Sequence, residues 1–278
     1  MRYRPILPAA AGALAAVHVL GILTGVPLLR QAEVAALLLL LAYALTVRPP
    51  GRPWAVPMAL TVLVVEAWTT MPADPADRKW QVLRPGAVDP TLGFVTGLRL
   101  SWAPLVLVLI LLWSTRWRDA RPGRPALAGA VLAATLVAAY AVVQLVEIHL
   151  AVRAAQRLSP GSGGPSDVEV AAAMLAPLAL AFGALVLTAL LTGRRHLLAA
   201  GGAVLLVLVA LTHLDAALAS LSLPPYTARG ALLTAAFHAN ASLPAAGPAV
   251  LLAVELAAYL LLVVGLVARH EQRVEPAG

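Results

Sequence analysis

Eight blocks of apolar residues, separated by polar segments, dominate this sequence of 278 residues. Most blocks run for roughly 17–25 residues, which at ~1.5 Å per residue lets an α-helix cross ~30 Å of hydrocarbon. Only 12% of the residues are charged, against about 25% in soluble domains, and the mean hydropathy is +0.87. We therefore expect an all-α, polytopic membrane bundle of about eight transmembrane helices, forming a single integral membrane domain over residues 1–278. The predicted helices are 6–29, 34–47, 54–71, 98–115, 126–152, 168–192, 197–221 and 247–268.

The basic residues predict the orientation of these helices. If the polar segments alternate between the two sides of the membrane, one side carries twelve of the 20 Lys and Arg residues and the other carries eight. Basic residues near membrane spans favour the cytoplasmic side, so both termini are predicted to be cytoplasmic. The longer loops then lie outside the cytoplasm. The twelve residues are Arg2, Arg4, Arg48, Arg52, Arg116, Arg118, Arg121, Arg124, Arg194, Arg195, Arg269 and Arg273.

Composition also excludes several classes of function. The chain has no cysteine, which removes disulfides, thiolate metal sites and cysteine nucleophiles. Its net charge of +7 comes from Arg residues in short loops, where they set topology and contact lipid head groups. We therefore expect the lipid bilayer as a partner and no nucleic acid. The excess of Arg over Lys fits a GC-rich genome, and we expect a multi-pass protein of the bacterial inner (plasma) membrane.

Seven ionisable side chains lie inside the predicted spans, where each is by default a candidate functional group. At ~1.5 Å per residue, all of them fall in the middle or outer layer of the membrane. The predicted spans contain no Arg or Lys deep enough to pair with the carboxylates. His213 and Asp215, two residues apart, give the strongest local signal. The seven residues are His18, Glu66, Glu147, His149, His213, Asp215 and Glu255.

Imidazole and carboxylate groups together bind first-row transition metals, among them Cu, Fe, Mn and Zn. The first functional hypothesis is therefore a membrane protein that binds or handles a transition metal in the outer half of the bundle. No compact ligand motif such as HExxH is present, so the site would have to be assembled across helices. The candidate ligands are His18, Glu66, Glu147, His149, His213 and Asp215.

Three other functional hypotheses are compatible with the same sequence. In a proton-coupled transporter, Glu66, Asp215 and Glu255 would relay protons. An enzyme acting on a lipid-linked substrate at the outer face would use carboxylates as acid and base. A structural or assembly subunit would instead bind other membrane subunits of a larger complex. The sequence does not choose between an enzyme, a transporter and a subunit.

Overall fold

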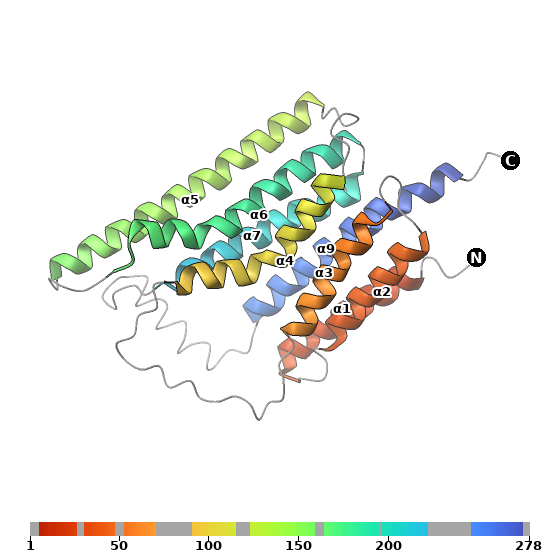
Figure 1. Cartoon of the computed structure of the whole chain (residues 1–278), viewed down its shortest axis with the longest axis horizontal. Coiled ribbons are helices and arrows are strands. Elements are labelled where there is room, and N and C mark those ends of the chain that lie inside the picture. The colour runs from red at the N-terminus through yellow and green to blue at the C-terminus, as the bar shows by residue number, and fades with distance from the viewer. Residues whose placement is uncertain are drawn as a thin grey trace.

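The computed structural model is a bundle of α-helices that run antiparallel to one another in chain order (Figure 1). It describes residues 6–26, 31–47, 53–70, 91–114, 123–158, 164–194, 196–221 and 246–274. Over these residues the polytopic all-α bundle predicted from the sequence is confirmed. The helices are α1 (Ile6–Thr24), α2 (Ala32–Val47), α3 (Ala55–Thr69), α4 (Leu92–Ser114), α5 (Arg124–Leu158), α6 (Asp167–Gly193), α7 (Leu197–Ala219) and α9 (Ala246–Val274).

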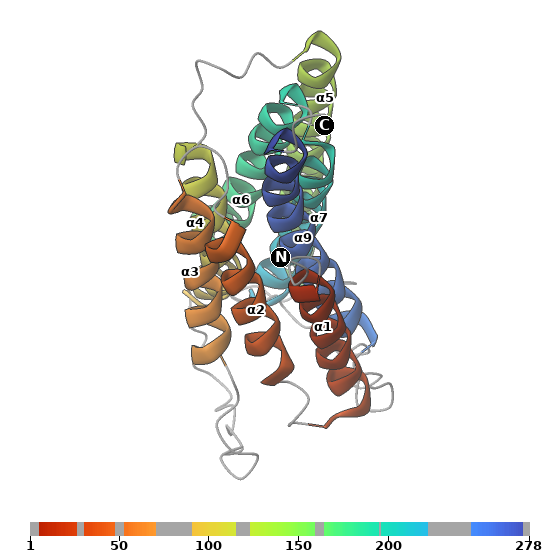
Figure 2. The ribbon, with the colours of Figure 1, turned by 90° about the vertical axis from the view of Figure 1, so that its right-hand side faces the viewer.

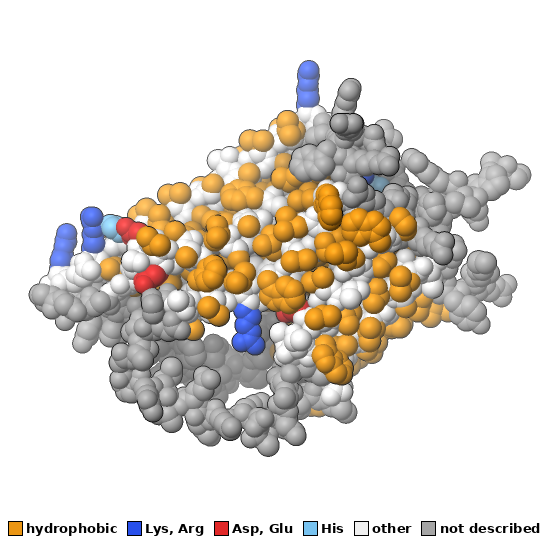
Figure 3. Space-filling model, in the orientation of Figure 1, with side chains coloured by type: hydrophobic (Ala, Val, Ile, Leu, Met, Phe, Trp, Pro, Cys, Tyr) orange, Lys and Arg blue, Asp and Glu red, His pale blue; other side chains and the backbone are white. Residues whose placement is uncertain are grey.

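Six of these helices are long and apolar enough to cross a membrane, namely α1, α4, α5, α6, α7 and α9. Their outward faces are covered with large hydrophobic side chains, such as Leu136 on α5 and Trp113 on α4. Figure 3 shows this apolar surface over the middle of the bundle, with few charged side chains on it. A surface of this kind is stable in hydrocarbon and not in water. The chain is therefore a multi-pass membrane protein in a lipid bilayer.

Two of the differences between the observed and the predicted helix ends involve glycine. Helix α1 ends at Thr24, five residues before the predicted end, because Gly25 adopts a φ of +70°. The Val26 N–H then bonds the Gly21 carbonyl at 3.0 Å, which is the pattern of a glycine-terminated helix. Helix α4 begins six residues before the predicted start, at Leu92. The sequence analysis placed its start just after Gly97, but that glycine is a packing residue inside the helix.

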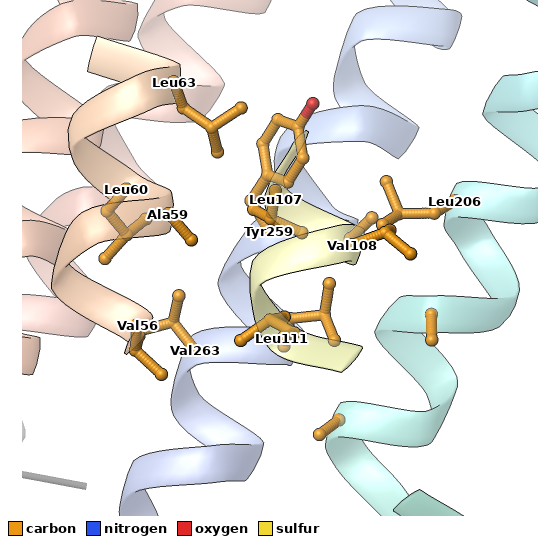
Figure 4. Packing of buried hydrophobic residues seen from close by; sticks show 14 of the residues in the cluster. Val56, Ala59, Leu60, Leu63, Leu107, Val108, Leu111, Leu206, Tyr259 and Val263 are labelled. Carbon is orange, nitrogen blue, oxygen red and sulfur yellow. The ribbon is translucent and has the colours of Figure 1, made fainter. Parts of the chain in front are cut away.

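The core lies between the two sides of the bundle. Figure 2 shows α9 in the middle, with α1 and α2 on one side and α6 and α7 on the other. The buried side chains of α3, α4, α7 and α9 interdigitate there. Figure 4 shows Leu60, Leu107, Val108 and Leu206 packed around this centre. Prolines lie inside two of the core helices, Pro104 in α4 and Pro177 in α6, and both are buried.

Helices α2 and α3 are shorter than their neighbours. They have 16 and 15 residues, so they are about 24 and 22 Å long, less than the ~30 Å of hydrocarbon in a bilayer. Helix α4, which packs against α3, has 23 residues. Figure 1 shows α3 ending short of the level at which α4 begins. The bundle is therefore stepped at the end where α2 begins and α3 ends, which we call the Glu33 end.

The directions of the helices agree with the prediction that both termini lie on the same side of the membrane. Helix α1 begins and α9 ends at the end opposite the Glu33 end (Figure 1). This agrees with termini on one side of the membrane, while the cytoplasmic assignment of that side stays a prediction. Most of the polar segments predicted to be long external loops, 72–97 and 222–246, lie outside the described residues.

Candidate functional site: two polar groups at one end of the bundle

Every ionisable residue singled out within the spans lies in the half of its helix nearer the Glu33 end. On α1, α3, α5 and α7 these residues come late in the helix, whereas Glu255 comes early in α9. Because the helices are antiparallel, both positions correspond to the same end. Most of the side chains belong to two groups, one on α2, α3 and α9, which His18 of α1 approaches, and the other on α5 and α7.

Three carboxyl groups make up the first group, which we call the acidic group: Glu33, Glu66 and Glu255. Glu33 is in the first turn of α2, Glu66 in the last turn of α3, and Glu255 in the third turn of α9. The charges of Glu66 and Glu255 both act on Glu33, and the charge of Glu66 also acts on Glu255. Like charges repel one another, and they do so more strongly in a low dielectric than in water.

Tyr259 connects the acidic group to the apolar core. Its hydroxyl donates a hydrogen bond of 2.5 Å to Oε1 of Glu255, one helical turn earlier on α9. The tyrosine is 4% exposed. Figure 4 shows its ring between Leu63 and Leu107, with the hydroxyl directed away from the packed side chains. The two residues are four positions apart on one face of α9, and Tyr259 holds one carboxyl oxygen at the edge of the core.

His18 approaches the acidic group from α1. Its Nε2 lies 3.4 Å from Oε2 of Glu33, and the imidazole is buried while the carboxyl is partly exposed. Glu33 was not among the predicted site residues, because it lies just before the predicted helix 34–47. The sequence does contain a signal for Glu33, because this residue comes just before a short apolar block. A helix as short as α2 keeps its first turn within the bundle.

A basic residue also faces the acidic group, which corrects the expectation that no Arg or Lys is available to these carboxylates. Arg99 lies in the second turn of α4 and acts electrostatically on Glu66. The sequence analysis counted it with an external loop, because it placed the start of α4 at residue 98. With the helix beginning at Leu92, the exposed Arg99 side chain lies near the level at which α3 ends.

The second group, which we call the Asp215 group, consists of Tyr140, Gln144 and Asp215. The Tyr140 hydroxyl donates to Oδ1 of Asp215 at 2.7 Å, and Nε2 of Gln144 donates to the same oxygen at 3.3 Å. Gln144 also donates to the Tyr140 hydroxyl at 2.7 Å. Tyr140 and Gln144, four residues apart in a polar stripe on α5 that also includes Glu147, thus contribute two donors, and both serve the single carboxylate of Asp215 on α7.

His213 does not join the Asp215 group, although it is only two residues away. Residues two apart on a helix point about 200° apart, and His213 faces α4, where its Nδ1 lies 3.3 Å from Oγ of Ser101. Both side chains are fully buried. Helix α7 therefore sends one polar side chain to α4 and another to α5. Both residues of the pair make polar contacts with neighbouring helices, but they do so at different interfaces.

The remaining candidates on α5 lie at its surface. Glu147 is exposed, although it belongs to the stripe that contains Tyr140 and Gln144. His149 is 3.4 Å from Oδ1 of Asp167, and both side chains are open to solvent or lipid head groups. Helix α5 continues to Leu158, six residues beyond its predicted end, so these residues belong to a helix that projects past its neighbours.

The residues predicted as metal ligands thus do not converge on one site. His18 contacts Glu33, Asp215 contacts Tyr140, and His213 contacts Ser101. Among the described residues, no three His, Cys, Asp or Glu side chains come together in a way that could hold a metal ion. Binding of Cu, Fe, Mn or Zn by these residues stays a prediction.

Comparisons of the chain with models of protein families, with curated proteins and with solved structures give no match. The two polar groups are therefore the basis for a functional proposal. They differ in chemistry: the acidic group has three mutually repelling carboxyl groups with one Arg and one Tyr nearby. The Asp215 group has one carboxyl group that accepts hydrogen bonds from two donors.

Proposed function

We propose that this protein is a proton-coupled membrane transporter whose proton-binding centre is the acidic group. The observation that carries the proposal is the mutual electrostatic action of Glu33, Glu66 and Glu255, which come from three different helices near one end of the bundle. Intramembrane carboxyl groups are costly and are typical of proton relays and coupling sites. Because each carboxyl group repels the others when ionised, protons bind to them as a coupled set.

The surroundings of the acidic group support the exchange of protons there. Tyr259 donates to Glu255, and Arg99 is an alternative partner for Glu66. Glu33 lies in the first turn of the short helix α2 and Glu66 in the last turn of α3, and the Glu33 side chain is 23% exposed. His18, 3.4 Å from Glu33, can accept or donate a proton at an imidazole nitrogen.

The arrangement of these side chains supports the proton-coupled hypothesis better than the transition-metal hypothesis. A transition-metal site needs three or more convergent ligands, and the described residues contain no such group. Proton exchange needs only carboxyl groups that interact and can reach water. An assembly subunit would not need three mutually repelling carboxyl groups in its interior, because charged groups inside a membrane protein are destabilising without a role.

The proposal is tested without knowing the transported substrate. The purified protein is reconstituted into liposomes on a solid-supported membrane, and a rapid pH jump is applied while displaced charge is recorded. Wild-type protein should give a transient charge displacement that falls at least about tenfold, the equivalent of ~1.4 kcal/mol, in Glu255→Gln and Glu66→Gln. Glu147→Gln is the matched control, since Glu147 is a glutamate of the same half of the bundle whose side chain is exposed on α5. Equal signals in all four proteins would refute the proposal.

We further propose that the Glu33 end faces the outside of a bacterial plasma membrane, so that protons enter the acidic group from the outside. The natural absence of cysteine allows single cysteines to report this directly. Thr70→Cys at the Glu33 end should react with a membrane-impermeant maleimide in intact cells. Gly123→Cys, at the opposite end and equally exposed, should react only after lysis. The reverse pattern would invert the topology.

A further inference from the structure

The first three turns of α4 connect the acidic group to a buried contact on α7. Arg99 acts on Glu66 of the acidic group. Two residues later, Ser101 contacts His213 on α7. Because residues two apart point to nearly opposite sides of a helix, one short segment reaches both Glu66 and His213. A movement of this segment would change both contacts together.

A proline separates this segment from the rest of α4. Pro104 has no N–H to bond the carbonyl of Leu100, and its ring crowds the preceding turn, so the helix is weakened at this point. The residues before it, 92–103, carry Arg99 and Ser101 together with the core residue Ala103, and those after it carry the core residues Leu107, Val108 and Leu111. The part of α4 that contains Arg99 and Ser101 and the part that contributes most of the core residues therefore meet at Pro104.

The partner of this segment on α6 is interrupted at the same level. Pro177 cannot donate to the carbonyl of Ala173, and that carbonyl oxygen instead faces Gly97 of α4. A Cβ on Gly97 would lie 2.6 Å from this oxygen and 3.1 Å from Cβ of Ala217 on α7. Only a residue without a side chain permits this approach. At Gly97 the two helices therefore meet backbone to backbone, closer than any larger residue would allow.

We propose that residues 92–103 of α4 turn as a unit about Pro104 when Glu66 gains or loses its proton, and thereby transmit the state of the acidic group to the Ser101–His213 contact. The trigger is the loss of attraction between Arg99 and a neutral Glu66. The other groups that act on Glu66 or share its site are Glu33 on α2 and Glu255 and Tyr259 on α9. The inference rests on the proposed function because it assumes that Glu66 exchanges protons.

Paired spin labels test this movement. One label is placed at Val95, exposed on the first half of α4, and the other at Leu20, exposed on α1; a second pair joins Leu20 to Leu109, exposed on the other half of α4. The neutral variant Glu66→Gln should shift the Val95–Leu20 distance on the order of 2 Å or more. The Leu109–Leu20 distance should stay unchanged, and Glu147→Gln should move neither.

Pro104→Ala restores the missing N–H, so the protein is expected to fold with a more regular α4. In this background Glu66→Gln should no longer shift the Val95–Leu20 distance. No shift in Glu66→Gln, an equal shift of both pairs, or a shift that survives Pro104→Ala would overturn the hinge. Charge displacement on a pH jump is recorded on the same proteins: if it persists while the distances stay fixed, the hinge fails and the proposed function stands.

Discussion

The two polar groups lie at the same end of the bundle but satisfy their carboxyl groups in opposite ways. Asp215 accepts hydrogen bonds from two side chains of α5, so its charge is compensated locally. Glu33, Glu66 and Glu255 instead act on one another as like charges, with Arg99 near one and Tyr259 bonded to another. A carboxyl group with dedicated donors fixes a structure, whereas several that repel one another are suited to exchanging protons.

This difference also explains how α5 is held in place. Helix α5 packs chiefly on α6 and exposes long apolar stretches. Its hydrogen bonds to Asp215 provide a polar attachment to α7 at membrane depth, where no water competes for the donors. The Asp215 group is therefore expected to matter for stability, and the acidic group for activity.

The largest stability effect is expected from Asp215→Ala. The change removes the acceptor that Tyr140 and Gln144 share, and with it these two hydrogen bonds between α5 and α7. The free energy of unfolding should fall by about 1–3 kcal/mol, measured by denaturant titration in detergent micelles. Tyr140→Phe removes one donor and should cost less, about 0.6 kcal/mol as for other interhelical hydrogen bonds in membranes. If Asp215→Ala lowers the free energy of unfolding no more than Glu147→Gln does, the Asp215 group has no structural role.

A smaller effect on stability is expected from Glu255→Gln, even though this variant should lose activity. The glutamine keeps an oxygen that can accept from Tyr259 and removes one of three like charges. The free energy of unfolding should therefore change by no more than about 1 kcal/mol in the same titration. A loss as large as that of Asp215→Ala would make the acidic group a structural element and erase the contrast between the two groups.

The smallest effect is expected from removing metal ions. Since proton exchange at the acidic group needs no metal, treatment with a chelator should leave the charge displacement after a pH jump unchanged. Elemental analysis of the purified protein should find less than stoichiometric Cu, Fe, Mn and Zn. One tightly bound transition metal per chain, with loss of the signal on its removal, would instead support the metal hypothesis drawn from the His and carboxylate residues.

The sequence predicts the helices well because each apolar block has a length imposed by the bilayer. It also predicts the common level of the polar residues, since depth follows from counting along antiparallel helices. The contacts could not be predicted in this way, because they depend on which helices are neighbours and how each is rotated. His213 and Asp215 look like a pair in the sequence, yet they face α4 and α5 respectively.

Glu33 and Arg99 were missed for a related reason. Both lie within two turns of a helix end, and a shift of a few residues in that end changes a membrane residue into a loop residue. For Arg99 the misleading signal was Gly97, which resembles a helix boundary but serves the close contact between α4 and α6. Such glycines are understood only when the neighbouring helix is known.

The central claim is that protons exchange at the acidic group and not at Asp215. Infrared difference spectroscopy after a pH jump reports carboxyl groups that gain or lose a proton through their C=O stretching band. The account predicts that this band is strongly reduced in Glu255→Gln and Glu66→Gln and retained in Asp215→Asn. A band that survives in both glutamate variants and disappears in Asp215→Asn would contradict it.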